Sequence, residues 1–126
     1  MKSILRTSQA PAAIGPYNQA VITGNRLYTA GQIPLDPATG QLVEGDFKDR
    51  VRRVMHNLEA ILQAGGTHFE NVVKTTIFVT DLGQFAELNE VYAEFFEAET
   101  APARSTVEVA ALPLGTDVEI EMIAEL

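Results

Sequence analysis

VVKTTIFVT, residues 72–80, is a run of β-branched and aromatic residues in which only Lys74 is charged. Residues of these kinds are enriched in β-strands, and a strand with so little charge is typical of a sheet interior with most of both faces covered. The stretch therefore predicts a central strand, and the segments on either side decide what kind of sheet the chain builds.

A helical pattern precedes this strand. Asp46 is placed to cap a helix start, and Gly65 and Gly66 are placed to end it. Between them, apolar residues recur at the spacing of one helix face, at Phe47, Val51, Val54, Met55, Leu58, Ile61 and Leu62. The segment is predicted to form an amphipathic helix.

A second helical pattern follows the strand at once. Asp81 and Gln84 resemble a capping box. The apolar stripe behind them consists of Phe85, Leu88, Val91, Tyr92, Phe95 and Phe96. We interpret the stripe as core rather than as a ligand site. The glutamates that crowd the same helix are interpreted as a solvated face, at Glu87, Glu90, Glu94, Glu97 and Glu99.

Strand-like segments fill both ends of the chain, at Tyr17–Ile22, Arg26–Ala30, Arg104–Ala110 and Val118–Ala124. A proline- and glycine-rich segment, residues 10–16, is expected to be an ordered arm. The order is strands, helix, strand, helix, strands, which predicts an α+β fold with both helices on one face of a mixed sheet. Because two helices cover only one face, we expect a homo-oligomer with ligand clefts between its subunits.

Length and composition narrow the class of protein. The 126 residues fit one domain, 1–126, and the chain has no cysteine, which excludes disulfides and thiol nucleophiles. A net charge of −8 disfavours nucleic acid as a partner. We expect a cytoplasmic protein, since no stretch has the apolar length of a signal peptide or a membrane span.

Few residues offer catalytic chemistry. His56 and His68 are expected on the surface, at no metal-ligand spacing, and the glycines form no phosphate-binding motif. Arg104 heads a strand, where an arginine is ordinarily a solvated charge, yet its planar fork of donors suits a small carboxylic acid. Glu119 and Glu121 share one face of the last strand, where a glutamate can hold a water or simply form a salt bridge.

Six blocks of sequence resemble the reactive-intermediate deaminase (RidA, or YjgF-like) family. They are residues 10–20 (APAAIGPYNQA), 30–34 (AGQIP), 89–92 (NEVY), 102–109 (PARSTVEV), 112–113 (LP) and 118–121 (VEIE). The blocks span nearly the whole chain in the family's order, and the separation of the PARS block from the last block is the family's own.

The resemblance implies a chorismate-mutase-like fold of about six strands, a homotrimer, and active sites between subunits. It also implies a cofactor-independent activity without a metal, the hydrolysis of reactive enamines and imines such as 2-aminoacrylate to 2-oxo acids and ammonia. Pyridoxal-phosphate enzymes release these intermediates. By position, Arg104 binds the substrate carboxylate and Glu119 positions the attacking water. The remaining pocket residues are Tyr17, Ala30, Gly31, Asn89 and Thr106.

Two positions depart from the family pattern, since many members have Cys where this chain has Thr106 and Ser where it has Ala30. Thr106 excludes a thiol role, and Ala30 removes a pocket hydroxyl. Two other functions stay open. One is an endoribonuclease or translation inhibitor, against which the acidic balance and the lack of paired histidines argue. The other is a non-catalytic regulatory trimer that binds 2-oxo acids.

Overall fold

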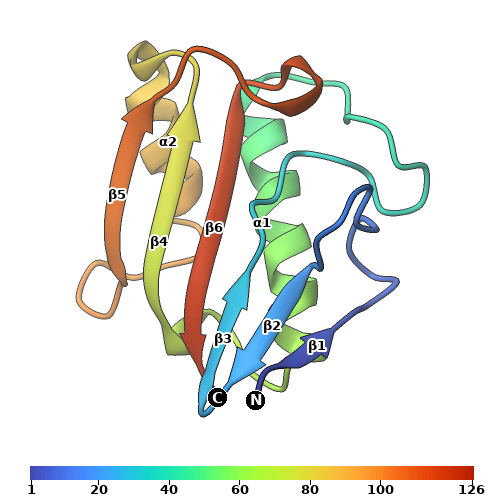
Figure 1. Ribbon diagram of the computed structural model, residues 1–126. Helices are drawn as coiled ribbons and strands as arrows, with labels where there is room; N and C mark the ends of the chain where they lie inside the picture. Colours follow the sequence, from blue (N-terminus) through green and yellow to red (C-terminus); the bar gives the residue numbers. More distant parts are fainter.

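The strand predicted at residues 72–80 forms β4 (Val72–Val79), which is paired on both edges inside a six-stranded sheet. The computed structural model describes residues 1–126, and the strands follow the order β1-β2-β3-β6-β4-β5 (Figure 1). Only β4 and β5 run parallel; the other neighbours are antiparallel. The other strands are β1 (Ser3–Leu5), β2 (Ala20–Thr23), β3 (Arg26–Thr29), β5 (Ala103–Glu108) and β6 (Val118–Glu125).

The first predicted helix is confirmed as α1 (Phe47–Ala64), with Gly65 as its C-cap. Asp46 caps the start, because its carboxylate accepts a hydrogen bond from the Asp49 amide at 2.9 Å. The Asp49 carboxylate accepts in return from the Asp46 amide at 3.3 Å. This reciprocal pair is the capping arrangement that sequence analysis had expected at the other helix.

The second helix is shorter than predicted. A 3₁₀ turn, Leu82–Gln84, comes first, and Asp81 caps the Gly83 amide within it at 2.8 Å, so the expected pairing of Asp81 with Gln84 is wrong. The helix α2 spans Phe85–Tyr92, which leaves Phe95 and Phe96 beyond its end. Leu88, Val91, Tyr92 and Phe96 are buried as predicted, whereas Phe85 is 42% exposed.

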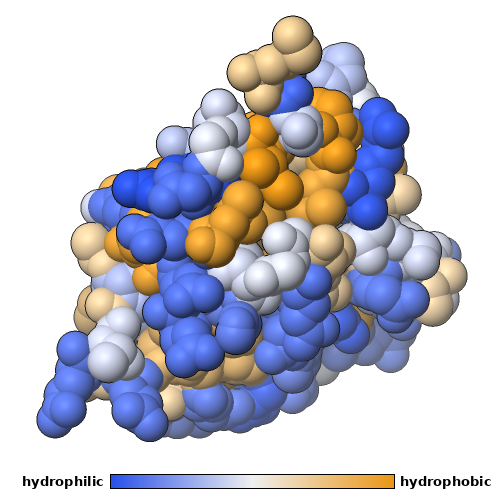
Figure 2. Space-filling model, turned by 90° about the horizontal axis from the view of Figure 1, so that it is seen from below, coloured by the Kyte–Doolittle hydropathy of each residue, from blue (hydrophilic) through white to orange (hydrophobic).

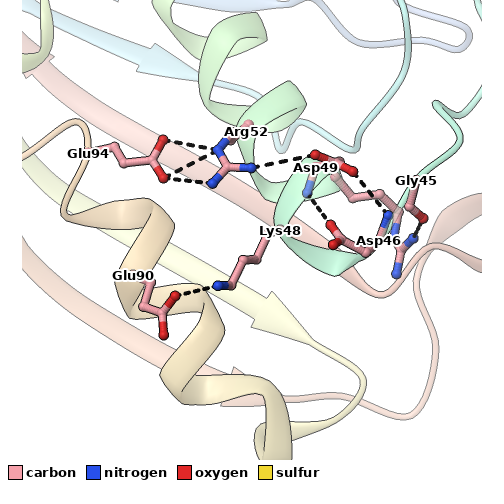
Figure 3. Close-up of polar contacts among 8 residues, drawn as sticks. Gly45, Asp46, Lys48, Asp49, Arg52, Glu90 and Glu94 are labelled. Atoms are coloured by element: carbon pink, nitrogen blue, oxygen red, sulfur yellow. Dashed lines mark hydrogen bonds and ion pairs between the residues drawn. The ribbon is translucent and has the colours of Figure 1, made fainter.

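The predicted solvated face is confirmed, since all five glutamates are exposed, and two of them also form ion pairs with α1 (Figure 3). Glu94 takes a bidentate contact from Arg52, with Nε and Nη2 donating at 3.0 and 2.9 Å, and Glu90 pairs with Lys48. These contacts lie at the surface, where ion pairs contribute little individually, about 0–1 kcal/mol. They link α1 to α2 and to the turn that follows α2.

The N-terminal arm is ordered through one buried side chain, that of Gln19. Its amide nitrogen donates to the carbonyls of Ala10 and Pro11 at 3.2 and 2.8 Å, and its amide oxygen accepts from the Thr7 amide at 2.7 Å. The predicted strand from Tyr17 therefore begins only at Ala20. The edge strand β1 was not predicted.

The core lies between the two helices and one face of the sheet, as the α+β prediction requires (Figure 1). The opposite face lacks a helix and keeps Ile4, Tyr28 and Val107 about 40% exposed. Figure 2, seen from the end where both termini lie in Figure 1, shows hydrophobic residues gathered in one area among hydrophilic ones. Neither helix is long and apolar enough to cross a bilayer.

Candidate active site in two halves

Arg104 lies on the helix-covered face of the sheet, at the edge beside α2. It pairs in register with Thr75 of β4, whose side chain is fully buried under the helices. Its Nη2 donates to Oδ1 of Asn89 at 2.8 Å, and its Cζ lies 4.8 Å from the ring centre of Tyr92. No carboxylate pairs with Arg104, although acidic residues outnumber basic ones by 17 to 9. The structure thus brings Arg104 and Asn89 together with donors of the fork still free.

Thr106 follows Arg104 on the same side of β5, in register with the buried Ile77. Its Oγ1 is buried and has no hydrogen-bond partner in the chain. Buried hydroxyls without a partner are rare, and a catalytic role is one of the explanations for them. Arg104, Asn89 and Thr106 form what we call the arginine half-site.

Glu119 lies on the opposite face of the sheet, in register with Phe78 of β4. The predicted common face of Glu119 and Glu121 is confirmed, since both are half-buried on one side of β6. The residues on its other side are buried, at Val118, Ile120, Met122 and Ala124. Burial raises the pKa of Glu119 above its ordinary value, and the negative charge of Glu121 raises it further.

Gly31 makes room for the Glu119 carboxylate. A Cβ atom at position 31 would lie 2.4 Å from Oε1 of Glu119, which is well inside van der Waals contact. Glu119, Gly31 and Tyr17 line a cavity of about 80 Å³ together with the arm residues Pro11 and Ala12 and with Pro113. We call this group the glutamate half-site.

The remaining predicted residues hold this half-site in shape. The hydroxyl of Tyr17 accepts a hydrogen bond from the Ile14 amide at 3.3 Å, which ties the ring to the arm. The Ala30 amide donates to the Gln19 carbonyl at 2.8 Å, and its side chain is not among those lining the cavity.

One chain does not bring the two half-sites together, because they occupy opposite faces of its sheet. Both groups are recognisable from the sequence, but the face that each occupies is not, since the register with β4 decides this. Tyr92 and Phe85 were not predicted as neighbours of Arg104. Their aromatic side chains at helical spacing indicate core packing. Only the folded structure places the Arg104 guanidinium of β5 against their rings.

The histidines lie outside both half-sites, and their predicted surface positions are confirmed. His56 pairs with Glu59 at 3.5 Å and His68 with Glu70 at 3.3 Å, each with its side chain more than half exposed. The structure gathers no group of three His, Asp or Glu side chains that could hold a metal ion.

Comparison with known protein families gives one match, over residues 7–126, to a family described as Endoribonuclease L-PSP. A RutC family protein of Pyrococcus horikoshii is 51% identical, with 98% of each chain covered. The protein named 2-iminobutanoate/2-iminopropanoate deaminase is 46% identical in Mus musculus and 43% in Homo sapiens. These matches cover 98% of this chain and 91% and 90% of those proteins.

Solved structures repeat the fold closely. A protein of the conserved Rid family from Yersinia pestis superimposes with a TM-score of 0.96 at 48% identity, and each chain is covered completely. The TdcF protein of E. coli, solved with bound serine, superimposes with a TM-score of 0.92 at 44% identity over 98% of each chain.

Proposed function

The chain belongs to the Rid (RidA or YjgF-like) family, and on that premise we propose that it is a 2-iminobutanoate/2-iminopropanoate deaminase that works without a cofactor. The mammalian relatives that carry this name support the proposal at 43–46% identity. The observation that carries it is Arg104, held by Asn89 and by aromatic rings yet paired with no carboxylate of its own chain.

Arg104 is the anchor for the substrate carboxylate. A guanidinium presents five N–H donors in one plane, and Asn89 uses one of them, so an edge remains free for a carboxylate. Such a charge-assisted contact contributes about 1.5–3 kcal/mol and fixes the orientation of the bound acid. The Thr106 hydroxyl, which has no partner in the chain, supplies a further hydrogen bond beside it.

Glu119 moves the proton. The oxygen of a water molecule forms a bond to C2 of the imine while the C=N electron pair moves to nitrogen, and the proton of that water passes to the Glu119 carboxylate. Glu119 then returns that proton to nitrogen, which completes a neutral amino group. The C2 hydroxyl next gives its proton, through Glu119, to the same nitrogen while the C2–N bond breaks, so that NH3 leaves with the electron pair and C2 keeps the oxygen as the oxo group. A raised pKa brings Glu119 nearer to neutrality, which suits a group that both accepts and returns a proton.

A complete site requires two copies of the chain, since Arg104 and Glu119 lie on opposite faces of one sheet. We propose a homotrimer in which the arginine half-site of one copy faces the glutamate half-site of the next. The exposed apolar residues of the face without helices, Ile4, Tyr28 and Val107, support such packing, because soluble chains seldom leave an extended apolar face uncovered.

The activity is tested by generating 2-aminoacrylate in situ with a dehydratase and trapping the surviving imine with semicarbazide. Wild-type protein should lower the trapped imine, and a folded Arg104→Ala variant should lose the effect. No acceleration by the wild type, or equal acceleration by this variant, would contradict the proposal.

The shared site is tested by complementation. Arg104→Ala and Glu119→Gln chains, each inactive alone, are co-expressed under different tags so that mixed oligomers form. In a closed ring, random assortment gives roughly one quarter of the sites an intact Arg104 and an intact Glu119. About that fraction of wild-type activity should return, whereas a site made within one chain would give none.

The names of some relatives keep an RNA-directed function as the second candidate, including the family description Endoribonuclease L-PSP. The two histidines are exposed and lie outside both half-sites, and the net charge of −8 opposes a phosphate backbone. RNA cleavage by highly purified protein that disappears in Arg104→Ala would favour it over deamination. A regulatory trimer would instead bind 2-oxo acids saturably without turnover.

A further inference from the structure

Arg104 is enclosed in a way that an arginine at a strand end ordinarily is not. Its Cζ lies 4.8 Å from the ring centre of Tyr92 and 5.4 Å from that of Phe85, within the range of cation–π attraction for both. Its Nη2 donates to Asn89. All three contacts come from α2, so one helix determines where the guanidinium lies.

The ring of Tyr92 is itself fixed. Tyr92 is 7% exposed, and its hydroxyl shares a 2.8 Å hydrogen bond with Oγ1 of the fully buried Thr75. The ring also packs against Phe96 at a tilt of 35°, with 4.7 Å between centres. Thr75 is the residue in register with Arg104 on the neighbouring strand, so β4 holds the ring that supports the arginine of β5.

Phe85 has a place that core packing does not explain. It begins the apolar stripe of α2 but keeps 42% of its surface exposed, whereas Leu88, Val91 and Tyr92 of the same stripe are buried. Among aromatic and cationic side chains, its contact is with the Arg104 guanidinium. A cation within about 6 Å of a ring centre is attracted by the negative face of the ring, so this contact accounts for the place of Phe85.

We propose that Phe85 and Tyr92, with Tyr92 fixed by Thr75, are positioning residues that hold the Arg104 guanidinium in its carboxylate-binding orientation before any ligand arrives. A free arginine side chain samples many rotamers, and restricting them on binding costs entropy that a side chain already held in place does not lose. Because the rings contact the guanidinium through their faces and Asn89 takes a single N–H, the remaining in-plane donors stay available. The inference rests on the proposed role of Arg104 as a carboxylate anchor.

The first test needs no ligand. Nitrogen-15 relaxation of the arginine Nε–H groups reports the order of each side chain, and Arg6 serves as an internal control because it makes no hydrogen bond or ion pair in the structure. Arg104 should be ordered in the wild type and more mobile in Phe85→Leu and in Thr75→Val. If Arg104 is as mobile as Arg6 in the wild type, the inference is wrong.

The second test separates the ring's electrons from its volume. Phenylalanine carrying one, two or three fluorines is placed at position 85, which weakens the negative ring face while nearly preserving its size. Binding of 2-oxobutanoate, measured by calorimetry, should weaken stepwise by about two- to fivefold across the series, in line with one exposed cation–π contact. The same series at Phe95, which contacts His56 and Phe69 but not Arg104, should leave binding unchanged.

The outcomes distinguish this inference from the proposed function. An ordered Arg104 with stepwise loss of 2-oxobutanoate binding supports the positioning role even if the protein never turns over an imine. Active deamination with flat binding across the Phe85 series, or equal losses in the Phe95 series, would overturn the positioning role and leave the deaminase proposal standing.

Discussion

Replacing Gly31 with alanine should abolish most activity without unfolding the protein. The new Cβ would lie 2.4 Å from Oε1, 2.8 Å from Cδ and 3.0 Å from Cγ of Glu119. Ordinary contact begins at 3.4 Å, so the carboxylate must retreat by about 1 Å. It can do so, because it is the end of a flexible side chain beside a cavity. Gly31 does not have a positive φ, so alanine fits the backbone.

The two effects of this substitution therefore separate. Displacing a catalytic group by about 1 Å costs on the order of 100-fold in kcat/KM, equivalent to about 2.7 kcal/mol of transition-state stabilisation. Alanine at a position compatible with its backbone restricts the unfolded chain and offsets part of any lost contact, so the free energy of unfolding should change by less than about 1 kcal/mol.

The assay compares kcat/KM for in-situ 2-iminobutanoate with thermal unfolding, both at one protein concentration, because assembly shifts apparent stability. Gly83→Ala is the matched control, since a Cβ there would lie 2.9 Å from Oδ1 of Asp81, a carboxylate outside both half-sites. It should keep wild-type activity. Full activity in a folded Gly31→Ala would show that the position of the Glu119 carboxylate does not matter, and an unfolded variant would show that the carboxylate cannot yield.

Three further outcomes are expected. Arg104→Lys should raise KM by about 10- to 100-fold in steady-state assays because an ammonium lacks the planar fork, and an unchanged KM would argue against the anchor. Glu121→Gln should move the acid limb of the pH–rate profile to lower pH. The active form of Glu119 is ionised, its pKa is raised first by burial and then by the charge of Glu121, and the substitution removes only the second cause. A limb that stays in place or moves to higher pH would contradict this assignment. Asp117→Asn should lower the free energy of unfolding by about 2 kcal/mol in denaturant titrations, because Arg50 donates to both Asp117 oxygens, at 2.9 and 2.6 Å, in a part-buried pair. An unchanged free energy of unfolding would show that the pair is dispensable.

Much of the fold follows from local pattern. The helix from Phe47, its cap at Asp46 and the alternation of the last strand were predicted from spacing alone, because in each case one face is buried and the period is unbroken. The second helix was predicted too long, since no glycine or proline marks its end at Tyr92. The edge strand Ser3–Leu5 carries too few residues to show a period.

The candidate site divides in the same way. Residue types and family blocks named Arg104 and Glu119, but the face that each occupies depends on its register with Thr75 and Phe78 of β4, which is a non-local property. The exposure of Phe85 was not predicted for a related reason. Its partner, Arg104, lies on β5, in a different element that follows α2 in the chain, so the contact is also non-local.

A site divided between two copies of the chain, as proposed above, would make the rate depend on protein concentration. If each reaction centre joins Arg104 of one copy to Glu119 of another, a diluted chain keeps its fold but loses its chemistry as the oligomer dissociates. Activity per milligram would then fall with dilution below the dissociation constant, while circular dichroism stays unchanged. A newly synthesised chain would remain inert until enough copies had accumulated to assemble.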